Sequence, residues 1–82
     1  MIRVTFINGS YYCESGKTKL KLKRDFFGKE SKLRRLLAGD IVTYQNIHED
    51  ISGKWITIKA RNNKIYDIRP EDLVYLKEHL RR

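Results

Sequence analysis

The segment that decides the fold is KTKLKLKRDFFGKESKLRR, residues 17–35. It contains nine basic and two acidic residues, a net charge of +7, whereas the whole chain of 82 residues carries +8. Its first half alternates, with Leu20 and Leu22 separated by single lysines. In a β-strand this period of two places the leucines on one face and the lysines on the other. The segment therefore predicts a strand with a buried apolar face and a basic outer face, not a flexible basic tail.

The composition predicts one small domain that spans residues 1–82. Apolar residues make up 40% of the chain and charged residues 34%, which is enough apolar content for one core and too much for a disordered chain. The single cysteine, Cys13, forms no intramolecular disulfide and no cysteine cage for a metal. No apolar run is long enough to cross a membrane, and MIRVTFIN at the start alternates instead of forming the apolar block of a signal peptide. We expect a cytoplasmic protein without a cofactor or a membrane partner.

Two tight turns precede the decisive strand. Residues 2–7 alternate as a half-buried strand, and Asn8-Gly9 is a strong hairpin signal because both central residues of a type I′ turn have positive φ. This turn pairs Val4 with Cys13. A second turn at residues 15–16 would fold the lysine strand back on residues 10–14. Tyr12 is then predicted to lie opposite Lys19 on the outer face.

A short helix is predicted at about residues 29–38. Leu33, Leu36 and Leu37 follow the i, i+3, i+4 spacing of one helix face. Gly39 is placed where a left-handed C-cap residue ends a helix.

The second half of the chain predicts two strands, a hairpin and a terminal helix. DIVTYQNI (40–47) and KWITIKAR (54–61) form the strands, the second with Ile56, Ile58 and Ala60 facing inward. A three-residue loop at 62–64 then gives the best pairing of the next strand. A helix is predicted at about 70–80, because Pro70 suits a first helical turn. Its apolar positions are Leu73, Leu76 and Leu80.

These elements together predict a mainly β fold. Five or six short strands joined by tight turns, with the two helices, are typical of a small barrel. We favour an OB-fold barrel and keep an SH3-like barrel as the second alternative.

The middle of the chain resembles the S1-type OB fold of translation initiation factor one and of the eukaryotic and archaeal factor one-A. The resemblance covers residues 28–61. The matching motifs are GK at 28–29, GDIV at 39–42, ED at 49–50 and GKWIT at 53–57. The tighter first hairpin, the longer arm before residue 28 and the extension after residue 61 depart from the family pattern. GDIV also opens strands in SH3-like barrels, including MazF-type toxins and KOW domains.

The resemblance implies a role in translation or transcription, with the ribosome or RNA polymerase as a partner. The family's basic loop contacts ribosomal RNA, and four residues of this chain match that loop: Lys29, Lys32, Arg34 and Arg35. Composition alone would not lead to this role.

The basic surface independently predicts binding of RNA, or of single-stranded DNA. Lysines neutralise phosphates, and exposed aromatic rings stack on unpaired bases, which is worth about 1–3 kcal/mol per base. Tyr12 and Trp55 are the predicted stacking platforms. The full set of predicted nucleic-acid-binding residues is Tyr12, Lys17, Lys19, Lys21, Lys23, Arg24, Lys29, Lys32, Arg34, Arg35, Trp55, Lys59 and Arg61.

Other interpretations of the same surface stay open. Alternating lysines can simply keep an exposed sheet soluble. The basic face can instead dock on an acidic protein partner, as an inhibitor or a subunit of an assembly. Lysine is depleted at the cores of protein interfaces, which favours phosphate over protein. A MazF-like endoribonuclease is a third alternative.

Catalysis has little support in the sequence. His48 lies beside two carboxylates and could act as a base, but neighbours on a loop rarely share the geometry of a site. His79 is expected on the terminal helix among charged residues, and Cys13 faces inward as a small core residue. No metal-ligand spacing or phosphate-binding glycine loop occurs. We therefore expect a binding protein and not an enzyme.

Overall fold

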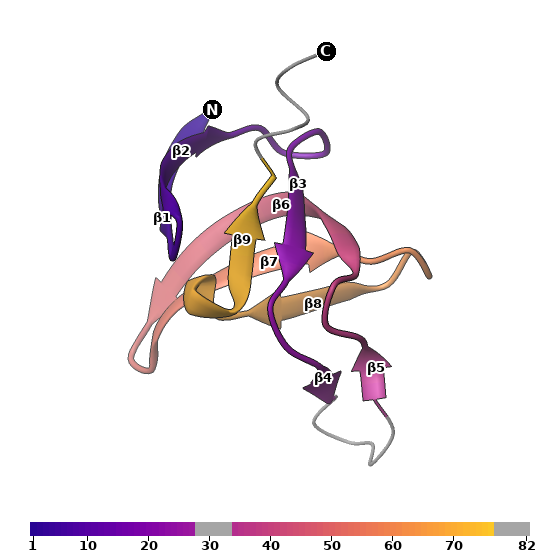
Figure 1. Ribbon diagram of the computed structural model, residues 1–82. Helices are drawn as coiled ribbons and strands as arrows, with labels where there is room; N and C mark the ends of the chain where they lie inside the picture. The colour runs from indigo at the N-terminus through magenta and orange to yellow at the C-terminus, as the bar shows by residue number, and fades with distance from the viewer. Residues whose placement is uncertain (28–33, 77–82) are drawn as a thin grey trace.

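The computed structural model describes residues 1–27 and 34–76, and the regular secondary structure of these ranges consists of β-strands and one 3-10 turn (Figure 1). The mainly β prediction is confirmed. The elements in chain order are β1 (Ile2–Phe6), β2 (Gly9–Cys13), β3 (Lys19–Leu22), β4 (Phe26–Phe27), β5 (Arg34–Leu36), β6 (Ile41–Asp50), β7 (Gly53–Lys59), β8 (Ile65–Ile68), the 3-10 turn η1 (Pro70–Asp72) and β9 (Leu73–Tyr75).

One antiparallel sheet organises the molecule. Its strand order is β8-β7-β6-β3-β9, while β1 with β2 and β4 with β5 form two separate hairpins. The sheet is strongly coiled, so that β3 and β9 cross in front of β7 and β8 in Figure 1. A single cluster of buried apolar side chains packs between these layers and under the β1–β2 hairpin. The predicted barrel is not seen, because over the described residues the sheets do not close on themselves.

Strand β3 confirms the alternation of leucine and lysine. Leu20 and Leu22 are buried, whereas Lys21 is exposed. The predicted partner of this strand was wrong, because β3 pairs with β6 on one edge and β9 on the other and does not pair with β2. The chain between β2 and β3 bonds to β6 instead: Gly16 N–H donates to Tyr44 O, and Tyr44 N–H donates to Thr18 O, both at 2.8 Å.

The N-terminal hairpin forms with a different register from the predicted one. Its two loop residues are Ile7 and Asn8, so Val4 lies opposite Tyr11 and not opposite Cys13. The shift is two residues in the pairing. Because side chains alternate with period two, every side chain keeps its predicted face.

Asn8 and Tyr75 attach this hairpin to the sheet. The Asn8 side-chain amide donates to Tyr75 O at 3.0 Å, and its carbonyl oxygen accepts from Tyr75 N–H at 3.3 Å. The Tyr11 ring stacks on the Tyr75 ring with centroids 4.1 Å apart, and its hydroxyl donates to Asn8 O. The Asn8 side chain therefore bonds to β9 as a neighbouring strand would, and it satisfies the backbone N–H and C=O of Tyr75.

The predicted helix at 29–38 is wrong where the structure describes it. Residues 34–36 form β5, in which Leu36 is buried opposite Phe26. The next two backbone N–H groups are satisfied by carboxylates: Leu37 N–H donates to Asp40 at 3.0 Å and Ala38 N–H to Asp25 at 2.8 Å. A helix would have satisfied the same groups with its own carbonyls, so the tertiary bonds override the leucine spacing. Residues 29–33 of this prediction lie outside the described ranges.

The predicted terminal helix at 70–80 is also wrong over its described part. Pro70 opens only the 3-10 turn η1, and the chain then extends as β9. Leu73 and Tyr75 are buried in alternation and pair with β3. The open edge of β3 offers backbone partners and core contacts, which outweigh a short helix. Residues 77–80 lie outside the described part of the chain.

The central strands agree well with the sequence, since Ile56 and Ile58 are buried on β7 as predicted. Two boundaries differ. Residues 48–50, expected in a loop, are part of β6. The last hairpin has a three-residue loop as predicted, but it is 61–63, because Ala60 N–H donates to Lys64 O at 2.9 Å. Asn63 takes the positive φ of 68° that this loop requires.

Replacing Asn8 by alanine should destabilise the protein by about 1–3 kcal/mol, because Tyr75 N–H and C=O lose their partner at a partly buried position. Urea unfolding followed by circular dichroism measures this. Asn46→Ala, at an exposed position on β6, is the control and should change stability little. Equal midpoints for Asn8→Ala and the unchanged protein would contradict this role of Asn8.

Candidate nucleic-acid interface

A group of lysines lies on the outer face of the five-stranded sheet. Lys19 and Lys21 come from β3 and Lys59 from β7. Lys19 lies opposite Thr43 of β6, and Thr43 lies opposite Lys59. We call this set the lysine face, together with the four residues that separate or flank its lysines: Ile41, Thr43, Ile65 and Val74.

The register fixes the spacing of these cations. Residues two apart on one face of a strand lie about 6.7 Å apart, and residues two strands apart about 9.6 Å. Lys19 Nζ donates to Thr43 Oγ1 at 2.7 Å, so this ammonium leans over β6 toward the strand that carries Lys59. The lysine face therefore gathers positive charge from β3 and β7 around one side chain of the strand between them.

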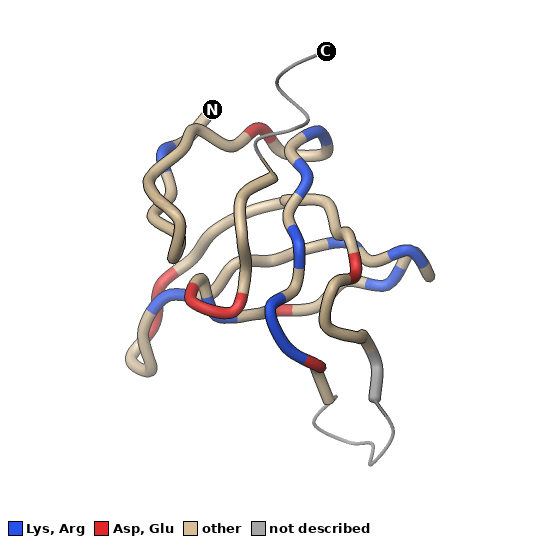
Figure 2. The backbone as a smooth tube through the Cα atoms, in the orientation of Figure 1, with Lys and Arg blue, Asp and Glu red and all other residues tan. Residues whose placement is uncertain are grey.

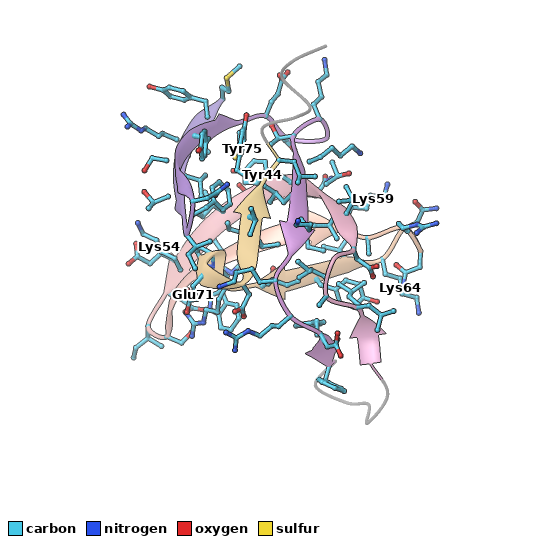
Figure 3. The ribbon with its side chains drawn as sticks, in the orientation of Figure 1. Tyr44, Lys54, Lys59, Lys64, Glu71 and Tyr75 are labelled. Carbon is cyan, nitrogen blue, oxygen red and sulfur yellow. The ribbon has the colours of Figure 1, made fainter. Side chains whose placement is uncertain are left out.

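The adjacent β7–β8 turn adds two further cations. Arg61 and Lys64 are exposed there, and Figure 3 shows Lys59 and Lys64 projecting at the same end of the molecule. Arg61 and Lys59 are among the residues predicted to bind nucleic acid, whereas Lys64 is not. Lys64 was predicted as the last residue of the 62–64 loop, where a lysine side chain is expected to be exposed.

One acidic side chain, Asp67, lies on the same outer face of the sheet, two residues from Ile65 on β8. Its carboxylate accepts from Thr57 Oγ1 at 2.7 Å. The ion pairs of the described ranges use other cations. Lys17 lies 3.8 Å from Glu14, and Arg24 lies 3.0 Å from Asp72.

The predicted stripe from Lys17 to Arg24 is therefore divided. Arg24 turns toward η1 through its pairing with Asp72, and Lys17 lies in the turn before β3 beside Glu14. Lys23 is exposed and follows β3, with its backbone N–H bonded to Asp72 O at 2.8 Å. Of the stripe, Lys19 and Lys21 share the sheet face with Lys59.

The basic segment that carries the family resemblance is described only in part. Arg34 and Arg35 lie on β5, which pairs with β4 and does not belong to the five-stranded sheet. Lys29 and Lys32 lie outside the described residues.

Tyr12 does not lie beside the lysines, contrary to the predicted pairing. It lies on β2 opposite Arg3, whose guanidinium is 6.0 Å from the ring centroid. The ring is exposed, but its hairpin is separate from the sheet that carries the lysine face. The pairing failed because β3 takes β6 and β9 as neighbours.

Arg69 covers one face of the Trp55 indole, so that face is not free to stack on a base. The Arg69 guanidinium lies 3.8 Å from the indole centroid and donates to Lys54 O at 3.2 Å. The indole N–H donates to Ser52 Oγ at 3.0 Å. Through these contacts Trp55 and Arg69 help to stabilise the β6–β7 hairpin. Nothing in the local sequence around Trp55 indicates its partner Arg69.

The charged residues are distributed unevenly over the surface. In Figure 2, basic positions run along β3 and around the β7–β8 turn, whereas acidic positions lie at η1 and near the tip of the β6–β7 hairpin. Figure 3 places Lys54 and Glu71 at the end opposite Lys59 and Lys64. Basic and acidic residues occur at both ends, but the basic positions along β3 and at the β7–β8 turn form a surface that can attract polyanions.

The structure describes the surroundings of three groups that bear on catalysis: His48, Asp50 and Cys13. His48 is exposed on β6 opposite Trp55. Hydrogen bonds from the Ser52 hydroxyl and backbone N–H lower the pKa of Asp50. Burial raises the pKa of Cys13 to about 11, which leaves almost no nucleophilic thiolate near neutral pH. No group of three His, Cys, Asp or Glu side chains suited to a metal ion occurs in residues 1–27 and 34–76.

Comparison with known protein families, curated proteins and solved structures finds no match for this chain. Within the part of the chain that the structure describes, no helix is long and apolar enough to cross a membrane. The arrangement of the side chains is therefore the basis for any functional conclusion.

Replacing Arg69 by alanine should expose the indole of Trp55. Tryptophan emission should move to longer wavelength, acrylamide quenching should increase, and stability should fall by about 1 kcal/mol through loss of the cation–π contact. Arg61→Ala removes an equal charge from an exposed turn and is the control. An emission spectrum unchanged by Arg69→Ala would contradict the described packing.

Proposed function

We propose that this protein binds nucleic acid through phosphate contacts on the lysine face and catalyses no reaction. The observation that carries the proposal is the row Lys19–Thr43–Lys59, which brings charge from separated segments onto one sheet face. Arg61 and Lys64 extend the positive surface at the adjoining turn. Ammonium groups at this density attract a polyanion, and their contacts weaken as salt rises.

The composition of the lysine face supports phosphate over an acidic protein as the partner. Its uncharged members are aliphatic residues and one threonine, with Ile41 and Ile65 partly exposed. Protein hot spots are enriched in Trp, Tyr and Arg, and interface cores are depleted of lysine. Docking on an acidic protein is the alternative that the test below must separate.

Strand β9 returns the chain to the beginning of the five-stranded sheet. β9 follows the 3-10 turn η1 and pairs with β3, the first strand of the five-stranded sheet. The GDIV motif leads into β6 and occurs in both predicted fold alternatives, the OB fold of the translation factors and the SH3-like KOW domains. This resemblance makes RNA, in a setting of translation or transcription, the proposed polyanion.

A pair of charge-matched variants tests the proposal. K21Q/K59Q removes two cations from the lysine face, and R3Q/K54Q removes two cations from β1 and the opposite end of β7. With a fluorescein-labelled RNA, anisotropy should show that K21Q/K59Q binds more weakly and reduces the slope of log affinity against log salt by about two. R3Q/K54Q should retain both affinity and slope.

Equal weakening by the two variants would contradict the lysine face as the binding surface. Poly-glutamate of equal total charge serves as the competitor. If it displaces the RNA as effectively as unlabelled RNA does, the acidic-protein alternative is favoured.

A further inference from the structure

The aromatic residues of the chain can be accounted for completely, because all nine lie in the described ranges. Two of them, Tyr12 and Phe27, are exposed, at 60% and 55%. Tyr12 is on β2 and Phe27 on β4, and neither strand belongs to the five-stranded sheet. The other seven are buried or partly buried: Phe6, Tyr11, Phe26, Tyr44, Trp55, Tyr66 and Tyr75.

The partly buried rings contact other side chains of the protein. Tyr11 stacks on Tyr75, and Phe26 packs edge-on against Tyr66 with centroids 5.4 Å apart. Trp55 is covered by Arg69. The lysine face therefore contains no aromatic side chain on which an unpaired base could stack.

A lysine face without aromatic side chains distinguishes between single-stranded and double-stranded nucleic acid as the ligand. Proteins that bind single strands combine a basic groove with stacking aromatics. The lysine face has the charge without the rings. Its ammonium groups are point charges that engage phosphates without a fixed fork geometry, and none of the residues that define the face is an Asn or Gln that could read the edge of adenine. A surface of this kind fits a polyanion whose bases are turned inward.

We infer that the lysine face binds the phosphate backbone of double-stranded nucleic acid, without stacking on bases and without sequence preference. This inference rests on the proposed function and specifies its ligand. A duplex presents one charge per about 1.7 Å of its axis. Cations placed about 6.7 and 9.6 Å apart by the sheet can therefore each meet a phosphate. Thr43, between Lys19 and Lys59, can donate a further hydrogen bond to a phosphate oxygen.

The test compares a labelled 20-base-pair RNA duplex with a labelled 20-nucleotide oligouridine, which stays unpaired. Binding is measured by anisotropy from 50 to 300 mM salt. The duplex should bind about fivefold or more tightly at 100 mM salt. Its log–log salt slope should lie between about −2.7 and −4.5, as expected for three to five phosphate contacts. Duplexes of different sequence should bind equally.

The double variant Y12A/F27A removes both exposed rings and is compared with K21Q/K59Q. Duplex binding should be weakened in K21Q/K59Q, with a log–log salt slope smaller by about two, and unchanged in Y12A/F27A. Tighter binding of oligouridine, weakened by Y12A/F27A, would overturn the inference and leave the proposed function standing. Equal affinity for both ligands would also overturn it. If neither ligand binds at 50 mM salt, the proposed function itself fails.

Discussion

The structure depends on β3 being bonded along both edges. Leu20 lies between Val42 of β6 and Tyr75 of β9, and all three side chains are buried. A strand fixed in this way cannot rotate or slip by one residue without burying lysines. Burial of each leucine contributes about 1.5–3 kcal/mol, so the same constraint that builds the core directs the lysines outward. The basic face is in this sense a consequence of the core.

The N-terminal hairpin complements this arrangement at the end of β9. Asn8 bonds to the Tyr75 backbone, while Tyr11 and Phe6 contact the Tyr75 ring. The hairpin covers the core from this side, since Val4 and Cys13 are buried beneath it. An uncovered edge strand invites pairing with another chain, and the Asn8 amide occupies the edge at this residue. Cys13 is protected in the same place, which agrees with its raised pKa.

The sequence predicted which side of each strand is buried better than it predicted which strands pair with each other. Period-two alternation correctly identified the buried sides of β1, β3 and β7, and it survived two hairpin registers that were each wrong by two residues. The choice of neighbour depends on contacts between distant segments, so the pairing of β3 with β9 could not be read from a local pattern. The leucines at 33–37 and 73–80 fit a helix as well as a strand, and in the described parts tertiary hydrogen bonds decided for the strand. Charge positions on strands were predictable, whereas the cover of Trp55 by Arg69 was not.

The central claim is that β3 lies between β6 and β9, because the position of the lysine face follows from it. Cross-strand nuclear Overhauser effects between backbone protons in the folded protein measure this pairing directly. The account predicts contacts from Lys21 to both Ile41 and Val74, and from Lys19 to Thr43. Contacts from Lys19 to Tyr12, with none from Lys21 to Val74, would contradict it. The lysines would then share a hairpin with an exposed tyrosine, and the lysine face described above would not exist.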